Sequence, residues 1–589
     1  MDVYGDNSSD YERYEQIPKD KKVLIIDNAD QVKRDSLNAF LANIDERFGY
    51  VVLVSKQLID ISLFERMKAE LETVNSVYRY RILPLYSDKR NELIERVVSL
   101  LIEDSGAVPK ISHVLSETIT AQRRFISLDP DFTIRYVEYY CNNIGDATHA
   151  DSSVFSKVFE ASLTTAISKY HTPRLSVDKV YVILSKIAHY IHFHKAYPIS
   201  EGQIMSIVAQ YNDDYGASVK GTDFITIATQ AKILTPEGEG TQFRFANKNY
   251  LAYYVAKEVN SRYNDTGDDT DLQSILKCAC FGINTDILMF ISYITDNIRI
   301  LRFILTMANE YTSEWMEFDF AENMPQFLRE ERKHIVELPP EDALQKEQQA
   351  EVMAEKASDE NLYTLDIYGY SDEDADQFIN QFIRAVQLLT VVARCLPNFE
   401  HNMLKADKEA FVEVIYSLPN KIFNMWAVET GKEVDEIIRF FKEQSRDYYV
   451  RQKELEDEDI IRALQWVSMS FLLELYNIPV FFATKDNTMG YLSSFGYSEK
   501  DTYKLEHLMM SERQAAAASF TEEAMSLGKE PKEHIYRTLI ARIVSHALIH
   551  KDGFDHSLRQ RLQAEYFPTK EAQKRINAKR FRKIQGENE

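Results

Sequence analysis

The stretch that decides the N-terminal fold is KKVLIIDNAD, Lys21–Asp30, in which four apolar residues run into two closely spaced aspartates. A short apolar run that ends in a carboxylate is typical of a buried strand in a parallel sheet. Such a strand brings Asp27 to the carboxyl edge of the sheet, where open α/β folds bind ligands. There Asp27 could hold a Mg²⁺ ion, directly or through water, and Asp30 could polarise an attacking water. The alternative is a buried strand that ends in an ordinary polar turn.

Residues 21–105 alternate short apolar runs with stretches of helical period, which predicts a partial parallel sheet with crossover helices. The second apolar run ends in Ser55 and Lys56. A hydroxyl and a cation would therefore reach the same sheet edge as Asp27, where they could sense a terminal phosphate. The predicted strands are Val23–Asp27, Tyr50–Ser55 and Tyr80–Leu85.

The rest of the chain is predicted to be mostly helical. Helical patterns at 177–194 and 201–214, then a further helix and two short strands around Gly238–Gly240, predict a winged helix. The C-terminal helices could form a solenoid or a bundle, because their periodicity does not choose between the two. The predicted divisions are a flexible acidic N-terminus at 1–20, a partial NTPase core at 21–105, a helical subdomain at 106–170, a winged helix at 171–260, helices at 261–328, a charged linker at 329–362 and a helical sensor or interaction region at 363–589.

Composition narrows the classes of partner and compartment. A formal charge of −23 argues against a nucleic-acid partner that grips the whole molecule, because phosphate binding needs a basic footprint. The role of the basic tail, 570–583, stays open between a solvated helix end and contact with nucleic acid or an acidic partner. Four irregularly spaced cysteines and an N-terminus without an apolar core predict a cytoplasmic protein.

One apolar run is long enough to raise the question of a membrane span. It is LQWVSMSFLLELYNIPVFFA, Leu464–Ala483, and Gln465, Glu474, Asn477 and Pro479 interrupt it. We therefore expect a buried core helix followed by a strand or loop, and no membrane span. Three histidines in AHYIHFHK, at 189, 192 and 194, have a spacing that can ligate metal, but their aromatic neighbours favour packing and surface roles.

The order of these parts resembles the STAND class of NTPases, the NACHT and NB-ARC relatives that act as sensors in bacterial defence and innate immunity. VLIIDNAD is similar to the family's Walker B pattern, with Gln31 in place of its final glutamate. VLVSK looks like the sensor 1 strand, with Lys56 where an arginine is usual. The resemblance covers residues 20–260 and implies ATP or ADP as the ligand, with Mg²⁺ held by Asp27.

Two further positions follow from the resemblance alone. FRFANKNYLAYYVA, Phe243–Ala256, looks like the motif that closes the family's winged helix, and Asn247 stands where a histidine often contacts the ADP β-phosphate. Pro130 corresponds to the proline that lines the adenine pocket. The resemblance therefore implies catalytic roles for Asp30 and Lys56, and nucleotide binding by Asp27, Ser55, Pro130 and Asn247.

A nucleotide site also needs a phosphate-binding loop, Gly-x₄-Gly-Lys-Ser/Thr, and these 589 residues contain no such string. We therefore expect this chain alone to bind no ATP, and hydrolysis only if a P-loop segment or subunit is supplied from outside it. Either the chain is the C-terminal part of a larger STAND protein, or it is a degenerate regulatory subunit. The resemblance further implies a protein ligand on the C-terminal helices and a homo-oligomer on activation. The rival interpretation is a non-enzymatic helical scaffold or adaptor with an NTPase remnant.

Overall fold

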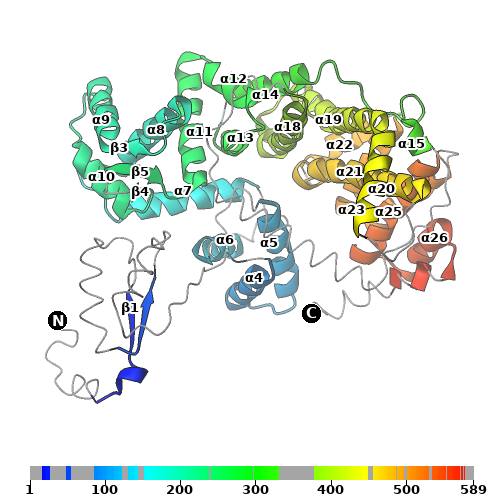
Figure 1. Ribbon diagram of the computed structural model, residues 1–589, viewed down its shortest axis with the longest axis horizontal. Helices are drawn as coiled ribbons and strands as arrows, with labels where there is room; N and C mark the ends of the chain where they lie inside the picture. Colours follow the sequence, from blue (N-terminus) through cyan, green and yellow to red (C-terminus); the bar gives the residue numbers. More distant parts are fainter. Residues whose placement is uncertain are drawn as a thin grey trace. The chain divides into compact units, whose positions relative to one another are not determined.

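A computed structural model shows a mostly helical protein with a small two-stranded parallel sheet near the N-terminus, as predicted (Figure 1). The chain divides into two compact units, Met1–Leu83 and Pro84–Glu589. The structure describes residues 16–26, 48–54, 85, 87–122, 130–142, 152–237, 241–295, 297–329, 377–448, 456–485, 487–496, 500–529, 533–551, 553–570, 572–574 and 576–577.

The first unit contains a short 3₁₀ turn, η1 (Lys19–Lys21), and two parallel strands, β1 (Val23–Ile26) and β2 (Tyr50–Leu53). The two strands pair in register from Val23 opposite Tyr50 to Ile26 opposite Leu53. Both lie where the sequence predicts strands. Of the predicted third strand, residues 80–84 lie outside the described residues, and Leu85 is not in a strand.

Gly49 lets the chain enter β2 close to η1. A Cβ atom at this position would lie 2.7 Å from the Lys19 carbonyl oxygen and 2.8 Å from the Asp20 Cα. The Gly49 N–H donates to the Lys22 carbonyl over 3.0 Å. The position therefore requires glycine for close backbone approach, because backbone atoms cannot move aside as a flexible side chain can.

The second unit begins with four helices. α4 packs against both α5 and α6 through buried side chains such as Ile94, Val98, Leu115 and Tyr136. α5, α6 and α7 fall in the range 106–170 that is predicted to be helical, and α4 falls in 21–105, where crossover helices are predicted. Their bounds are α4 (Ser87–Leu101), α5 (Val108–Gln122), α6 (Pro130–Asn142) and α7 (Ser152–Ser168).

A small antiparallel sheet, ordered β3-β5-β4, follows, with α8, α9 and α10 beside it (Figure 1). The predicted helices and hairpin of this region are confirmed. The two-residue strand β3 was not predicted, since so short a segment has no readable period. Ser200 begins α9 with a reciprocal capping box to Gln203, and Gly216 ends it in the left-handed region. The elements are α8 (Val177–His194), β3 (Ile199–Ser200), α9 (Glu201–Tyr215), α10 (Gly221–Gln230), β4 (Leu234–Glu237) and β5 (Gln242–Phe245).

The chain continues through a central set of helices. α11 packs against α8 on one side and α13 on the other, which links the antiparallel sheet to the helices that follow. The elements are α11 (Lys248–Thr266), α12 (Thr270–Lys277), α13 (Asn284–Ile294), α14 (Ile298–Tyr311) and α15 (Gln326–Arg329).

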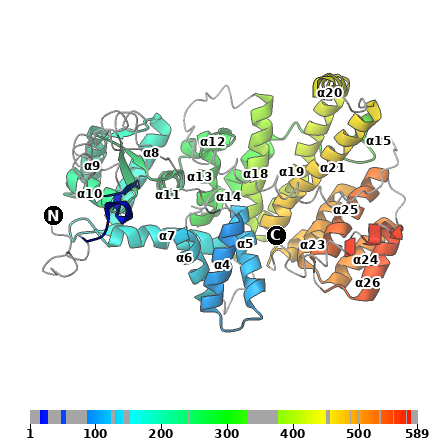
Figure 2. The same ribbon diagram turned by 60° about the horizontal axis from the view of Figure 1, so that its bottom comes forward.

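The C-terminal helices share an aromatic core. Phe471 of α21 lies 5.9 Å from Phe382 of α18 and 5.3 Å from Trp426 of α19, between ring centroids, and Figure 2 shows these three helices side by side. The elements are α18 (Phe378–Phe399), η4 (Glu400–Asn402), α19 (Lys405–Lys432), α20 (Val434–Tyr448), α21 (Asp457–Phe482), α22 (Met489–Gly496), α23 (Asp501–Gln514), α24 (Ala517–Gly528), α25 (His534–His550) and α26 (His556–Tyr566).

The prediction of a strand or loop after a core helix in 464–483 is wrong, because α21 is continuous through Phe482. Pro479 lies in its last turn, where burial of Tyr476 and Val480 outweighs the hydrogen bond that proline removes. Among the described residues one stretch, Phe378–Asn402, is long and apolar enough to cross a membrane, and 67% of its most apolar 18-residue window is buried within the protein. That burial is typical of a core helix.

Candidate functional site

The four residues predicted at the sheet edge, Asp27, Asp30, Ser55 and Lys56, lie outside the described residues. The strands that precede them end side by side. Ile26 pairs with Leu53, and the Val54 N–H donates to the Ile26 carbonyl over 2.8 Å. The common edge of β1 and β2 is therefore the one from which the chain continues toward Asp27 and Ser55, and the roles of these residues stay predictions.

No residue of the two described strands is buried. Ile25 is 67% exposed, Tyr50 is 63% exposed, and Val23 and Val52 are also exposed. Parallel sheets are usually covered by helices on both faces, which is why their strands are apolar throughout. The described part of this unit thus has a sheet whose composition fits burial and whose side chains are exposed or only half-buried.

Pro130 is the first residue of α6 and is exposed. Proline suits this position because its missing N–H would be unpaired in any first helical turn, and its φ angle is already helical. The helix start therefore accounts for Pro130 without a ligand.

Asn247 is the N-cap of α11, and its side-chain oxygen accepts a hydrogen bond from the Tyr250 N–H over 2.9 Å. The next residue, Lys248, pairs with Asp286 of α13 over 3.1 Å, and the Asp286 side chain is fully buried. The start of α11 is thus tied to α13 by a buried ion pair. This arrangement gives Asn247 a structural role whether or not it contacts a nucleotide.

The histidines of α8 are part of a polar cluster with α11 and α12. His189 Nε2 lies 2.8 Å from Asp271 Oδ2 and 2.6 Å from Arg262 Nη1. Burial and the neighbouring His189 lower the pKa of His192 to about 4, so this imidazole is neutral at pH 7. Within the described ranges no group of histidine, cysteine or carboxylate side chains could hold a metal ion.

A buried serine–histidine–glutamate array joins α22, α23 and α24. His507 Nε2 lies 3.1 Å from Ser493 Oγ, and His507 Nδ1 lies 2.6 Å from Glu523 Oε1. Ser511 donates to the other Glu523 oxygen over 2.6 Å. The order of atoms is that of a hydrolytic triad, but the His507 side chain is only 2% exposed. The array ties three helices together, and a substrate would have little access to its imidazole.

After α14, a largely non-helical segment that ends with the short helix α15 inserts aromatic side chains into the C-terminal helices, in a range predicted to be helical. We call Trp315–Arg329 the strap. Phe318 packs edge-on to Phe423 of α19 at 4.7 Å, and Phe320 packs edge-on to Tyr536 of α25 at 5.3 Å. The sequence signal was MEFDF, in which acidic and aromatic residues alternate and the helical period is lost.

Polar groups also hold the strap. Lys500 and Tyr503, at the start of α23, both donate to one Glu317 carboxylate oxygen, over 2.8 and 2.9 Å. The Phe318 N–H donates to the Asn420 carbonyl of α19 over 3.1 Å, and Gln465 of α21 donates to the Phe327 carbonyl over 2.7 Å. These polar contacts come from three helices, and the contact of Phe320 with Tyr536 adds a fourth, so the strap lies in a groove that the C-terminal helices build together.

Beneath the strap, Glu506 of α23 is fully buried, and neither of its carboxylate oxygens has a hydrogen-bond partner in the described part of the chain. Burial, and then the nearby charge of Glu317, hold the pKa of Glu506 well above its ordinary value. An unpartnered buried carboxyl is costly and rare, and such groups concentrate at functional positions.

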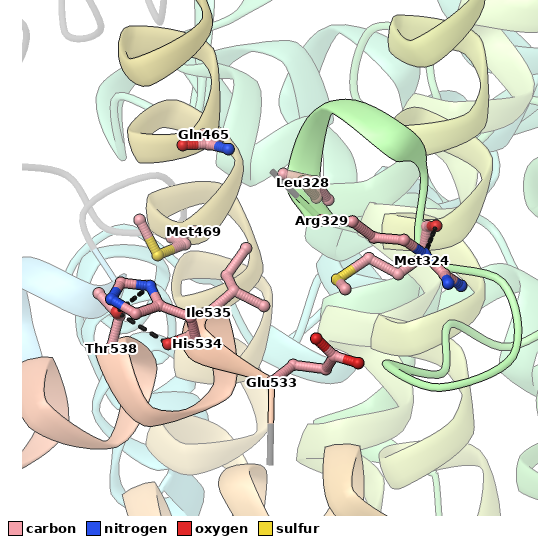
Figure 3. A pocket seen from close by; sticks show the side chains of 9 residues that line it. All are labelled: Met324, Leu328, Arg329, Gln465, Met469, Glu533, His534, Ile535 and Thr538. Carbon is pink, nitrogen blue, oxygen red and sulfur yellow. Dashed lines mark hydrogen bonds between the residues drawn. The ribbon is translucent and has the colours of Figure 1, made fainter. Parts of the chain in front are cut away.

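At the other end of the strap a small cavity separates it from α21 and α25 (Figure 3). Met324 and Arg329 face it from the strap, Met469 from α21, and His534 and Thr538 from α25. It has room for about one water molecule. The strap is therefore anchored by its aromatic side chains and fits the groove incompletely at this end.

No model of a known protein family matches this sequence, and neither does any protein of described function.

Proposed function

We propose that this chain is the C-terminal part of a cytoplasmic STAND-type switch, in which a P-loop outside these residues completes the nucleotide site. The observation that carries the proposal is the parallel strand pair. β1 and β2 have the apolar composition of covered strands, yet Val23, Ile25, Tyr50 and Val52 are exposed. They end at one edge, directly before Asp27 and Ser55. A further strand and its helices would cover this sheet and bring phosphates to that edge.

The element order that follows supports the same proposal. α8, β3, α9, α10 and the β4–β5 hairpin follow one another as the parts of a winged helix do, with sheet order β3-β5-β4. In the proposed switch this unit contacts the nucleotide domain in one state and leaves it in the other. The buried Lys248–Asp286 pair then makes the winged helix and α13 move together.

Within the completed site the residues of this chain have distinct roles. Asp27 holds Mg²⁺, and Asp30 orients or polarises the attacking water. Ser55 and Lys56 contact the terminal phosphate from the neighbouring strand. The winged helix and the C-terminal helices convert the presence of that phosphate into a change of assembly.

The test begins with the intact chain alone, which we expect to show no micromolar binding in calorimetric titration with ATP and Mg²⁺. The tagged chain is then purified from its native cells, and mass spectrometry determines whether it carries, or copurifies with, a Gly-x₄-Gly-Lys-Ser/Thr sequence. In that complex Asp27→Ala is expected to lower ATP hydrolysis by more than about tenfold.

Asp20→Ala is the matched control, because Asp20 lies in the exposed turn before β1, away from its carboxyl end. It should leave hydrolysis unchanged. Micromolar ATP binding by the chain alone, or a complex in which Asp27→Ala turns over as the wild type does, would overturn the proposal.

A second candidate is a non-enzymatic helical scaffold, which is favoured by the structural roles of Asn247 and Pro130. Both residues have local helix-start functions that need no nucleotide. Under this candidate the native complex contains no P-loop polypeptide and retains no nucleotide.

A further inference from the structure

The strap binds its groove as a separate peptide would. Its contacts are of the kinds that bind short peptides. A lysine and a tyrosine donate hydrogen bonds to a carboxylate, and two aromatic rings are buried against other aromatic rings. Phe318 and Phe320 are 2% and 4% exposed, whereas Met316 between Trp315 and Glu317 is 66% exposed. The groove therefore selects particular side chains of the segment and leaves others in solvent.

The strap also forms its turn from its own residues. The Asp319 N–H donates to the Asn323 side chain over 2.8 Å, and the Asp319 carboxylate accepts from the Ala321 N–H over 2.8 Å. Asn323 in turn donates to the Glu317 carbonyl over 2.7 Å. Because these bonds are local, a segment of similar sequence in another protein could adopt the same shape before it binds, which lowers the entropic cost of binding.

The fit between strap and groove is incomplete at both ends. Glu506 lies buried and unpartnered among the described residues near Glu317, and the cavity lies beside Met324. A segment that belonged only to the core would be expected to satisfy such a carboxyl, whereas a space for one water is common in any core. A groove that exchanges one occupant for another is expected to leave such a carboxyl without a partner.

We propose that the strap is an autoinhibitory occupant of a peptide-binding groove, and that an acidic-aromatic segment of a partner protein displaces it. The segment has a carboxylate followed by aromatic residues one and three positions later, as Glu317, Phe318 and Phe320 are placed. Lys500 and Tyr503 bind the carboxylate, and the rings enter against Phe423 and Tyr536. The proposal that the groove binds a peptide does not depend on the proposed nucleotide switch. The effect of that peptide on signalling does depend on it.

Displacement of the strap would affect the central helices, because the strap follows α14 closely in the chain. α14 is joined to α19 by Arg302, which pairs with both carboxylate oxygens of Asp407 over 2.7 and 2.9 Å. α14 also packs against α18. A released strap would remove the connection from α14 to the groove and leave this ion pair as a remaining link.

The experiment measures fluorescence anisotropy of a labelled peptide with the sequence of residues 314–325, EWMEFDFAENMP, and the intact chain without nucleotide. The wild-type chain should bind weakly, because its own strap competes. Phe318→Ala combined with Phe320→Ala should raise the apparent affinity by at least about tenfold, since the groove is then open in a larger fraction of molecules. Adding Lys500→Glu should abolish that gain.

Two controls make the result specific. Glu314→Ala removes an exposed carboxylate just before the strap and should behave as the wild type does. A peptide in which both phenylalanines are alanine should not bind any variant. If circular dichroism shows that the double variant has lost helix, Glu317→Ala replaces it, because this change keeps both rings and removes only the ionic contact.

The proposal is overturned if neither folded variant gains affinity over the wild type, or if Lys500→Glu leaves the gain unchanged. A failure of this kind is distinct from failure of the nucleotide switch, since no nucleotide or P-loop partner takes part in the measurement. A tenfold gain that Lys500→Glu abolishes supports the groove and its ligand class.

Discussion

The two sheets of this protein differ in how far the described residues bury them. In the parallel pair, no residue of β1 or β2 is buried. In the antiparallel sheet, Ile199, Leu234, Phe243 and Phe245 are all at most 4% exposed. The central strand β5 alternates between buried and more exposed side chains, as strands of antiparallel sheets commonly do.

This difference shows which of the two sheets the described residues leave uncovered. A hairpin with one buried face can be completed by nearby helices, and α8 to α11 are those helices. A parallel pair exposes both apolar faces and both edges until crossover elements cover it. Among the described residues, the uncovered sheet is therefore the one in the first unit.

The largest expected effect is a difference between the two sheets in the stability lost on substitution of an apolar residue. Phe245→Ala should destabilise the antiparallel unit by about 3–5 kcal/mol, because it leaves a cavity in a closed core. Ile25→Ala should cost less than about 1 kcal/mol, because the side chain is 67% exposed. Hydrogen exchange of the amides of each sheet measures both. Equal losses of protection would contradict the contrast.

A smaller effect on stability is expected only at acidic pH, in the unit that contains the buried antiparallel sheet. His192 of α8 has its pKa lowered to about 4 by burial and by His189. The unfolded chain takes up a proton near pH 6.5 and the folded chain only near pH 4, so stability is present above pH 6.5 and is lost as the pH falls. The loss should reach about 3 kcal/mol at pH 4.

His192→Gln cannot titrate and should remove most of this dependence. Thermal unfolding of the intact chain across pH 4 to 7 is the measurement. The strand pair should show no such step, and an identical pH profile for the wild type and the variant would exclude His192 as the cause.

The same substitution should have opposite effects in the two regions. Gly49→Ala places a Cβ 2.7 Å from the Lys19 carbonyl oxygen and should destabilise the strand pair by about 1–3 kcal/mol. Gly202 lies in the first turn of α9 with nothing within 4 Å of its Cβ position, so Gly202→Ala should stabilise by up to about 1 kcal/mol. Denaturant titration monitored by hydrogen exchange distinguishes the two. Destabilisation by both would mean that the close approach at Gly49 is not special.

The smallest expected effect concerns Asn247, which caps α11 in the structure and which the resemblance makes a nucleotide-binding residue. Asn247→Ala should cost about 1 kcal/mol, because it removes the N-cap of α11. Asn247→Asp keeps a capping oxygen and should restore stability. If nucleotide binding by the native complex also falls with Asn247→Ala and returns with Asp, the residue acts through the helix start. A loss that Asp does not restore would indicate direct contact with the ligand.

Much of the fold could be predicted because it depends on local patterns. The strands β1 and β2, the helices α8 and α9 and the hairpin β4–β5 each have a clear period or turn signal. The course of α21 through Pro479 could not be predicted, because burial of Tyr476 and Val480 outweighs the local preference. The roles of Asp27, Asp30, Ser55 and Lys56 remain predictions, since they lie outside the described residues.

By itself the sequence determined the helical character, the apolar strands that run into Asp27 and Ser55, and the lack of a phosphate-binding loop in these residues. The exposure of β1 and β2, the capping of α11 by Asn247 and the packing of the strap in its groove could be seen only in the folded chain. The cause is the distance along the chain between residues that interact. Periodicity reports which residues share a face of one element, whereas the bond from Tyr503 to Glu317 joins residues 186 positions apart. Only folding brings such partners together.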